Sequence, residues 1–434
     1  MQINLERPRK FMADISPPGD KSIAHRALLL NSLGTGKSRI SYFPRGQDTL
    51  ATLNTLVSLG VNIKEEIRSE NGFFSTLNLE ATGISGLHDP ETVLDAKNSG
   101  TLFRLLLGLL AGSKVKATMT GDESLRTRPM GRIIEPLKLM GANIFGKDEG
   151  SFPPITVIGA NLHGISYQMQ IASAQLKSAI LIAGLSSEGE TVIVEPTPTR
   201  NHTENMLINM GASLIRKKDE IHLKPGELHN IDINIPADIS SAAPWLVAGL
   251  IHRNAKVTLR NVGVNPTRTG ILDVLSDMGG DIKIDYTTTV DSEPVADITV
   301  QSSELKGIEI SGDIIPRLID ELPLIAVAAT QAKGNTVIKD AAELRVKESD
   351  RIENTVEALR ILGARVEAKH DGMVVSGNGS LRGGKVHSSY DHRMAMAFAV
   401  CSLVSDKDVF IENADATDVS YPGFWDDFLG AFKD

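Results

Sequence analysis

The sequence predicts a two-domain α/β protein whose most apolar helices lie inside and whose sheets lie outside. At 434 residues the chain is too long for one common core. Two helix-to-strand patterns alternate along it, with six copies of each. The helices of the second pattern are apolar on nearly every face, so other elements must surround them. A repeated unit of two helices and several strands follows from these observations.

The first pattern is an amphipathic helix that ends at Leu-Gly or Met-Gly and is followed by a strand. The glycine stands where a helix end favours a left-handed residue, and the β-branched residues after it favour extended chain. In the fifth copy, Asp350 and Glu353 can form a capping box, and Ile352, Val356 and Leu359 share one face. The copies cover 53–63, 133–144, 205–215, 272–282, 352–366 and a truncated 424–432.

The second pattern is a polar turn, a very apolar helix, a short turn and a strand. Its copies cover 21–40, 98–119, 173–194, 238–259, 320–338 and 391–411. Because three copies lie on each side of residue 238, we expect domains of three repeats each: 1–19 with 238–434, and an inserted 20–237. The chain would cross near 235–237 and at 17–19, forming a hinge with a cleft between the halves.

Composition narrows the range of partners and compartments. The net charge of −9 argues against generic binding to nucleic acid or anionic membranes, which requires an excess of Lys and Arg. The N-terminus carries charges in place of a signal peptide, and the apolar stretches 105–111 and 322–329 are too short to span a membrane. We therefore expect a cytoplasmic protein that binds neither nucleic acid nor membrane.

The single cysteine and the histidines offer little chemistry. Cys401 permits no internal disulfide, which fits a reducing compartment. Its setting, MAFAVCSLV, is the apolar body of a helix and favours packing over a role as nucleophile. The histidines show no HExxH or paired ligand spacing, so we predict no metal site.

Polar residues gather at the starts of the apolar helices, first of all at Lys21, Ser22 and Arg26 after a Pro-Pro-Gly turn. For a single helix, capping and a solvated charge explain such residues. In six copies of one unit the helix starts are expected to share one end of the structure, where they would bind anions. Arginines in RTRPMGR and RVKESDR add donors suited to phosphate and carboxylate, although surface charge explains each of them about as well.

The segment Gly34-Thr35-Gly36-Lys37-Ser38 only partly matches a phosphate-binding P-loop. That motif needs a glycine where this chain has Asn31, and it must follow a strand instead of a helix. The segment also occupies the same place in its repeat as SEGETVI and AKGNTVI. We interpret it as a helix-to-strand turn.

Six motifs together resemble the family of 5-enolpyruvylshikimate-3-phosphate synthases. They are PGDKSIAHRALLL, NSGTLFRLLLGLLAG, GDESLRTRPMGR, SAQLKSAILIAGL, ELRVKESDRI and DHRMAMAF, in order along nearly the whole chain. The resemblance implies a two-domain inside-out α/β barrel, each domain with three βαβαββ repeats. It also implies transfer of the carboxyvinyl group of phosphoenolpyruvate to the 5-hydroxyl of shikimate 3-phosphate, with release of phosphate and without a cofactor. We expect a monomer.

The resemblance also assigns candidate site residues, which we match one by one. Shikimate 3-phosphate would contact Lys21, Ser22, Arg26, Ser173, Gln175, Thr199, Arg200, Asp320 and Lys347. Phosphoenolpyruvate would contact Lys21, Asn98, Ser99, Gly100, Arg128, Gln175, Arg351 and Arg393. Two phosphates and two carboxylates would thus be held by a locally cationic site in an acidic protein.

The reaction needs two proton-transfer groups, because the hydroxyl loses a proton while the methylene carbon gains one. Asp320 is the candidate base at the hydroxyl, and Glu348 the candidate acid, and later base, at carbon. Lys347 and Lys21 would stabilise the departing phosphate. Closure about the hinge would exclude water from a hydrolysable intermediate.

Two departures from one branch of the family point to its second sequence class. Ala174 replaces a second serine, and Val419, near Tyr421-Pro422, replaces a lysine whose role stays unassigned. Gly100 has no side chain to crowd the phosphoenolpyruvate pocket, so we predict inhibition by glyphosate, to be checked by titration against phosphoenolpyruvate.

Two alternatives stay open. The sister enolpyruvyl transferase that acts on UDP-N-acetylglucosamine shares the fold, but it usually carries a reactive cysteine in a loop where this chain has only Arg126 to Gly131. The second alternative is a non-catalytic anion-binding protein with the same fold. In such a protein Asp320 and Glu348 would only repel the bound phosphates.

Overall fold

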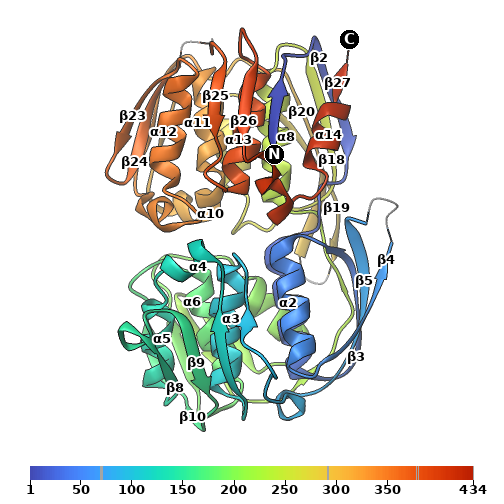
Figure 1. Cartoon of the computed structure of the whole chain (residues 1–434), viewed down its shortest axis with the longest axis vertical. Coiled ribbons are helices and arrows are strands. Elements are labelled where there is room, and N and C mark those ends of the chain that lie inside the picture. Colours follow the sequence, from blue (N-terminus) through green and yellow to red (C-terminus); the bar gives the residue numbers. More distant parts are fainter. Residues whose placement is uncertain (69–71, 291–292, 378, 380, 434) are drawn as a thin grey trace. The chain divides into compact units, whose positions relative to one another are not determined.

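The chain forms two compact units in a computed structural model, which describes residues 1–68, 72–290, 293–377, 379 and 381–433 (Figure 1). Unit 1 comprises Met1–Asp20, Pro236–Thr289 and Pro294–Asp434. Unit 2 comprises Lys21–Ile235 and Val290–Glu293. Each unit has its own hydrophobic core.

Unit 2 contains seven α-helices and four sheets among its described residues. The helices are α1 (Lys21–Leu33), α2 (Gln47–Ser58), α3 (Gly100–Ala111), α4 (Glu123–Thr127), α5 (Gly131–Leu139), α6 (Ala174–Gly184) and α7 (His202–Asn209). The strands are β3 (Gly34–Pro44), β4 (Asn62–Ile67), β5 (Phe74–Thr82), β6 (Leu94–Asp95), β7 (Lys116–Thr120), β8 (Asn143–Lys147), β9 (Phe152–Ile158), β10 (Leu162–His163), β11 (Ser166–Gln168), β12 (Ser187–Glu188), β13 (Thr191–Val194), β14 (Leu214–Lys217), β15 (Glu220–Leu223), β16 (Leu228–His229) and β17 (Ile233–Asn234).

Unit 1 likewise contains seven α-helices, with three sheets, in the part of the chain that the structure describes. The helices are α8 (Ile239–Ile251), α9 (Gly270–Asp277), α10 (Ile315–Leu318), α11 (Leu322–Thr330), α12 (Arg351–Ile361), α13 (His392–Ser402) and α14 (Phe424–Gly430). The strands are β1 (Gln2–Leu5), β2 (Lys10–Ile15), β18 (Ala255–Gly263), β19 (Asp281–Val290), β20 (Glu293–Gln301), β21 (Glu309–Ile310), β22 (Gly334–Ile338), β23 (Arg365–Lys369), β24 (Gly372–Gly377), β25 (Gly384–His387), β26 (Val409–Glu412) and β27 (Phe432–Lys433).

The repeats predicted from the sequence reappear in the strand order of the sheets. Three sheets, β6-β7-β9-β8, β11-β13-β15-β14 and β21-β22-β24-β23, share one arrangement. In each, a short first strand runs parallel to the strand after the apolar helix, and a hairpin then adds two antiparallel strands. This is the βαβαββ unit.

The remaining repeats borrow strands from distant parts of the chain. In unit 2, β3 takes its parallel partners from β16 and β17. In unit 1, β18 pairs in parallel with β2, and β1 pairs antiparallel with β26. In each unit, strands that lie near the ends of its chain segments therefore pair with one another and complete the sheets.

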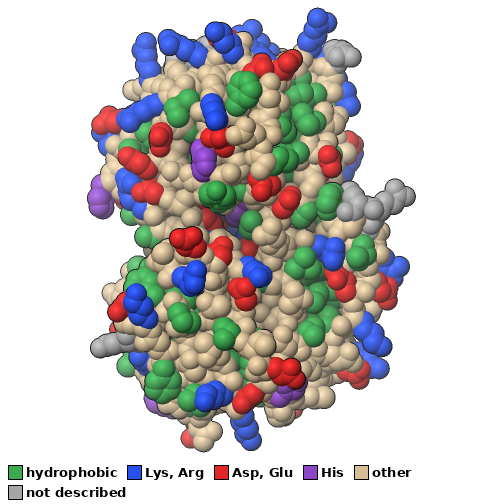
Figure 2. All heavy atoms as spheres, in the orientation of Figure 1, with side chains coloured by type: hydrophobic (Ala, Val, Ile, Leu, Met, Phe, Trp, Pro, Cys, Tyr) green, Lys and Arg blue, Asp and Glu red, His purple; other side chains and the backbone are tan. Residues whose placement is uncertain are grey.

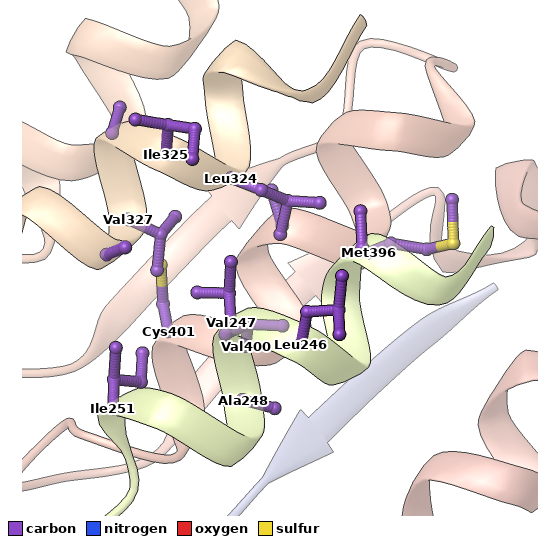
Figure 3. Packing of buried hydrophobic residues seen from close by; sticks show 14 of the residues in the cluster. Leu246, Val247, Ala248, Ile251, Leu324, Ile325, Val327, Met396, Val400 and Cys401 are labelled. Atoms are coloured by element: carbon purple, nitrogen blue, oxygen red, sulfur yellow. The ribbon is translucent and has the colours of Figure 1, made fainter. Parts of the chain in front are cut away.

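The most apolar helices lie in the cores, as predicted. All 13 residues of α8 and all nine of α11 are buried. The side chains of α8, α11 and α13 interdigitate, for example Leu246 and Val247 with Leu324 and Val400 (Figure 3). The predicted fold class, a two-domain α/β protein with inner helices and outer sheets, is confirmed.

The amphipathic helices end as predicted in five of six copies. Gly60, Gly141, Gly211, Gly279 and Gly363 follow their helices with φ between 88° and 97°, a conformation that costs a glycine little. The sixth copy differs, because Gly430 is still the last residue of α14. The Asp350 cap is confirmed, since its side chain accepts from the Glu353 backbone N–H at 3.0 Å.

The segment 34–38 is not the turn that we predicted. Strand β3 begins at Gly34, directly after α1, and Lys37 pairs with Glu80 of β5 in the antiparallel ladder. The ladder holds the segment extended, so the P-loop interpretation is excluded by its conformation as well as by its spacing.

Cys401 lies inside the core of unit 1, between Val247, Val327 and Ile251 (Figure 3). Burial raises the pKa of its thiol to about 12. We therefore expect no reaction of the folded protein with a thiol reagent such as Ellman's reagent at pH 8, because the reactive thiolate is both rare and inaccessible. In guanidinium chloride one thiol per chain should react. Rapid labelling of the folded protein would contradict this packing.

On the face drawn in Figure 2, acidic and basic side chains are interspersed and hydrophobic atoms form small separate patches. In the described residues, none of the helices is long and apolar enough to span a membrane.

Candidate active site

Lys21 is the first residue of α1 and is held by an acidic partner on α2. Its ammonium lies 2.9 Å from Asp48 Oδ2, and the side chains are 16% and 7% exposed. The pair fixes the ammonium at the start of α1. We did not predict Asp48, whose only signal in the sequence is its place in the first turn of a helix.

Arg26 lies one turn further along α1 and is buried. Its Nε donates to Thr203 Oγ1 at 2.6 Å, and its Nη2 donates to Ser178 Oγ at 3.0 Å. Its Nη1 donates to the Ser22 carbonyl at 3.0 Å. Side chains of α6 and α7 therefore orient this guanidinium.

The start of α3 and the loop after α4 come together around Arg128. Its Nη2 donates to Asn98 Oδ1 at 2.6 Å and to Ser124 Oγ at 3.0 Å. A methyl group on Gly100 would lie 3.4 Å from Arg128 Nη1. Three of the predicted phosphoenolpyruvate contacts, Asn98, Gly100 and Arg128, are thus neighbours within unit 2.

Gln175, at the start of α6, is oriented by residues of α3. Arg104 Nη1 donates to Gln175 Oε1 at 2.6 Å, and Gln175 Nε2 donates to Thr101 Oγ1 at 3.0 Å. Two of the apolar helices thus begin side by side, as the repeat pattern predicts. Arg104 and Thr101, which we did not assign to the site, thus both orient this amide.

Ser99 and Ser173 serve as helix caps. Ser99 Oγ accepts from the Leu102 backbone N–H at 3.2 Å, and Ser173 Oγ accepts from the Leu176 N–H at 3.3 Å. The capping interpretation is therefore correct for both. A capping serine keeps a hydroxyl proton to donate, so a contact with substrate stays a prediction.

Thr199 and Arg200 belong to the turn that precedes α7. Thr199 is buried, and its hydroxyl donates to Glu195 Oε1 at 2.5 Å. Its side chain is thus already engaged inside the protein, which leaves the turn's backbone and Arg200 to meet a ligand. Their predicted role in binding shikimate 3-phosphate stays a prediction.

In unit 1, Arg351 joins three carboxylates. The guanidinium lies 2.8 Å from Asp391 Oδ2, 3.2 Å from Asp320 Oδ1 and 2.6 Å from Glu348 Oε2. Burial alone would lower the pKa of Arg351, but the carboxylates of Asp391, Glu348 and Asp320 raise it above its ordinary value. The buried side chain therefore stays charged, and it connects the candidate base to the candidate acid.

Two more cations surround Asp320. Lys347 Nζ lies 3.4 Å from Asp320 Oδ1, and Arg393 Nη2 lies 3.8 Å from Asp320 Oδ2. All five site residues predicted for the C-terminal half, which also include Glu348 and Arg351, are thus brought together. Ion pairing requires the carboxylate form of Asp320, which is also the form that a general base needs.

A buried network of ion pairs and hydrogen bonds connects Arg393 to Arg268. Arg393 Nη1 lies 3.2 Å from Glu321 Oε1, and Ser240 Oγ donates to the same carboxylate. Arg268 Nη2 donates to Ser240 Oγ at 2.8 Å and lies 3.1 Å from Asp238 Oδ1, while its Nη1 lies 3.3 Å from Asp20 Oδ2. Burial lowers the pKa of Arg268, but the surrounding carboxylates raise it above its ordinary value.

The two sets of residues differ in chemistry. Unit 2 supplies hydrogen-bond donors and cations suited to phosphate and carboxylate. Unit 1 supplies two carboxyl groups, those of Asp320 and Glu348, each paired with Arg351, and carboxyl groups can take and give protons. Among the described residues, no group of three or more His, Cys, Asp or Glu side chains is arranged to hold a metal ion.

Solved structures identify the fold as that of an enolpyruvyl transferase. The enolpyruvyl transferase NikO from Streptomyces tendae superposes with a TM-score of 0.78, over 100% of this chain and 98% of that one. At 15% sequence identity this likeness concerns the fold alone.

Closer relatives define the family. The family model described as EPSP synthase (3-phosphoshikimate 1-carboxyvinyltransferase) matches residues 5–428. A 3-phosphoshikimate 1-carboxyvinyltransferase of Bacillus cytotoxicus is 46% identical over 424 residues, 98% of each chain. The structure of the EPSP synthase of Acinetobacter baumannii is 39% identical, with a TM-score of 0.87 over 100% of this chain and 98% of that one. The chain belongs to the EPSP synthase family.

Proposed function

We propose that the chain transfers the enolpyruvyl group of phosphoenolpyruvate to the 5-hydroxyl of shikimate 3-phosphate and releases inorganic phosphate. The hydroxyl group loses its proton to a base while its oxygen bonds to the central carbon of phosphoenolpyruvate, and the methylene carbon gains a proton from an acid. In the tetrahedral intermediate, the bond between the central carbon and the phosphate oxygen then breaks, and inorganic phosphate leaves. The methyl group loses one proton, which restores the double bond. Proton transfer is thus needed at an oxygen and at a carbon.

One observation supports our choice of the two proton-transfer residues. The buried guanidinium of Arg351 contacts both Asp320 and Glu348. We assign Asp320 as the base at the hydroxyl, because three cationic groups hold it as a carboxylate. We assign Glu348 as the acid and later base at carbon, since of the other two carboxyl groups on Arg351 it is the accessible one, 21% exposed against 0% for Asp391. Lys347 would neutralise the departing phosphate.

We assign substrate binding chiefly to the donors of unit 2. Arg26, Ser173 and Arg200 would hold shikimate 3-phosphate, and Ser22 and Thr199 would support them. Arg128 with Asn98, Ser99 and Gly100 would hold phosphoenolpyruvate, together with Arg351 and Arg393 of unit 1. Lys21 and Gln175 would contact both substrates. Preorganised donors of this kind strengthen most when water is excluded.

The test is phosphate release from phosphoenolpyruvate in three parallel reactions. One contains shikimate 3-phosphate, one contains UDP-N-acetylglucosamine, and one has no acceptor. We expect release only with shikimate 3-phosphate. Release only with the nucleotide sugar would favour the sister transferase, and no release in any reaction would favour a binding protein.

Gly100→Ala should raise the KM for phosphoenolpyruvate about tenfold, with less than a twofold change for shikimate 3-phosphate. The added methyl group would lie 3.3 Å from Arg104 Nη1 and 3.4 Å from Arg128 Nη1, and crowding of this kind costs roughly 1–3 kcal/mol. Steady-state kinetics measures the change. Gly226→Ala is the control, because a methyl group there meets nothing within 4 Å. An unchanged KM would remove Gly100 from the phosphoenolpyruvate site.

We further propose that the enzyme works as a cytoplasmic monomer on these two small molecules. The single cysteine supports the compartment, because a reducing environment suits a buried free thiol. Light scattering after size-exclusion chromatography should give the mass of one chain, 46.7 kDa. Twice that mass would contradict the monomer.

A further inference from the structure

An ammonium group is buried in the apolar helix α6. Lys177 is 0% exposed, and the residues that follow Ser178, from Ala179 to Gly184, are buried and apolar. Burying a lysine is costly unless its charge is paired. The pairing must therefore come from elements packed against α6.

Two carboxylates supply the pairing, and a second cation pairs with one of them. Lys177 Nζ lies 2.8 Å from Glu195 Oε1 and 2.7 Å from Glu204 Oε1, and these side chains are 1% and 5% exposed. Arg216 Nη2 lies 2.9 Å from Glu195 Oε2. We call Lys177, Glu195, Glu204 and Arg216 the α6–α7 charge cluster. Its charges balance.

The cluster holds the turn that carries Arg200. Glu195 Oε1 accepts from the Thr199 backbone N–H at 3.0 Å and from the Thr199 hydroxyl at 2.5 Å. Lys177 Nζ donates to the Thr199 carbonyl at 3.4 Å. Three contacts thus fix the residue immediately before Arg200.

The neighbouring residues of the same two helices orient Arg26. Ser178 follows Lys177 on α6, and Thr203 precedes Glu204 on α7. Their hydroxyls are 2.6 Å apart, and both accept from the Arg26 guanidinium. The contact between α6 and α7 therefore supports both Arg26 and the 195–199 turn.

Stability alone does not explain such a cluster. Replacing a buried ion pair with well-packed apolar side chains is often neutral or stabilising, because desolvation offsets the attraction. An apolar residue at 177 would match the rest of α6. What an apolar residue could not do is hold the Thr199 carbonyl and neutralise Glu195.

We propose that Lys177 and Glu195 are positioning residues for shikimate 3-phosphate. The inference rests on the proposed function, and it goes further by assigning two buried residues that touch no substrate. They hold the Thr199–Arg200 backbone in place, so that the donors of the turn and of Arg26 are set before the substrate phosphate arrives. Preorganisation of this kind lowers the cost of binding.

Glu195→Gln is the decisive variant, because it keeps the size of the side chain and an oxygen acceptor for Thr199 but removes the charge that pairs with Lys177. We expect the dissociation constant and the KM for shikimate 3-phosphate to rise about tenfold, or about 1.4 kcal/mol. The kcat and the KM for phosphoenolpyruvate should stay within twofold. Titration calorimetry with shikimate 3-phosphate and steady-state kinetics measure these quantities.

Glu65→Gln is the matched control, because it breaks the pair that Glu65 forms with Arg45 at 2.8 Å in the same unit. It should leave all constants unchanged. Equal shikimate 3-phosphate binding by wild type and Glu195→Gln would overturn the inference, even if the variant melts at a lower temperature. If wild type itself neither binds nor turns over shikimate 3-phosphate, the proposed function fails and the inference fails with it.

A second variant covers the case in which Glu195→Gln does not fold. Arg216 is 35% exposed, so Arg216→Met is expected to fold while loosening the other oxygen of Glu195. We expect a two- to fivefold weaker dissociation constant for shikimate 3-phosphate. With Glu195→Gln unfolded, an unchanged constant in Arg216→Met would overturn the inference.

Discussion

Replacing Glu348 with Gln is expected to lower kcat by about 10²–10⁴-fold while shikimate 3-phosphate still binds. The amide has nearly the size of the carboxyl group and can still accept from Arg351 Nη2, which lies 2.6 Å from Glu348 Oε2. It cannot give or take the proton at the methylene carbon of phosphoenolpyruvate. Phosphate release measures turnover, and titration calorimetry measures binding.

Glu353→Gln provides the matched control for this variant. Glu353 lies in the first turn of α12 with a 59% exposed side chain, and its ion-pair partner is Arg345, at 3.8 Å. Its turnover should equal that of wild type. Turnover retained in Glu348→Gln would rule out Glu348 as the proton-transfer group and leave that step to another residue.

Arg268→Met should cost about 3–5 kcal/mol of the free energy of unfolding, because it leaves buried carboxylates without their cation. Arg268 is 2% exposed and lies within 3.3 Å of both Asp20 and Asp238. The methionine fills much of the space, so the loss reports mainly on the charge. Denaturant unfolding followed by circular dichroism measures it.

Arg260→Met is the comparison. Arg260 also pairs with two carboxylates, those of Asp14 and Asp297, each at 2.7 Å, but its side chain is 49% exposed. Water replaces such contacts at little cost, so the free energy of unfolding should hardly change. Equal losses in the two variants would show that the number of partners matters more than burial.

The fold could be predicted from the sequence because its signals are local and repeated. A helix that is apolar on nearly every face, such as α8, cannot lie on a surface. A glycine such as Gly141, after an amphipathic helix, marks the helix end where a strand can follow. The pattern misled us only where local context decides, as at Gly34, where the chain passes from helix to strand without a turn, and at Gly430, which stays helical.

The candidate site was predicted in part. Residues at helix starts, such as Arg26 and Asp320, have a position in the repeat that singles them out. The residues that orient these side chains have no such position in the repeat. Asp48 lies 27 residues along the chain from Lys21, and Arg104 lies 71 residues from Gln175, so only the tertiary structure brings these pairs into contact. Supporting residues of this kind need long-range contacts that no local pattern encodes.

The borrowed strands of unit 1 have a consequence for synthesis. Strand β1 pairs with β26, residue Ile3 with Ile411, and the terminal amino group lies 2.6 Å from Asp415. At 5–20 residues per second, roughly 20–80 s pass on the ribosome before that partner emerges. Strand β1 must therefore wait for β26, and we expect a nascent chain to complete unit 2 before unit 1.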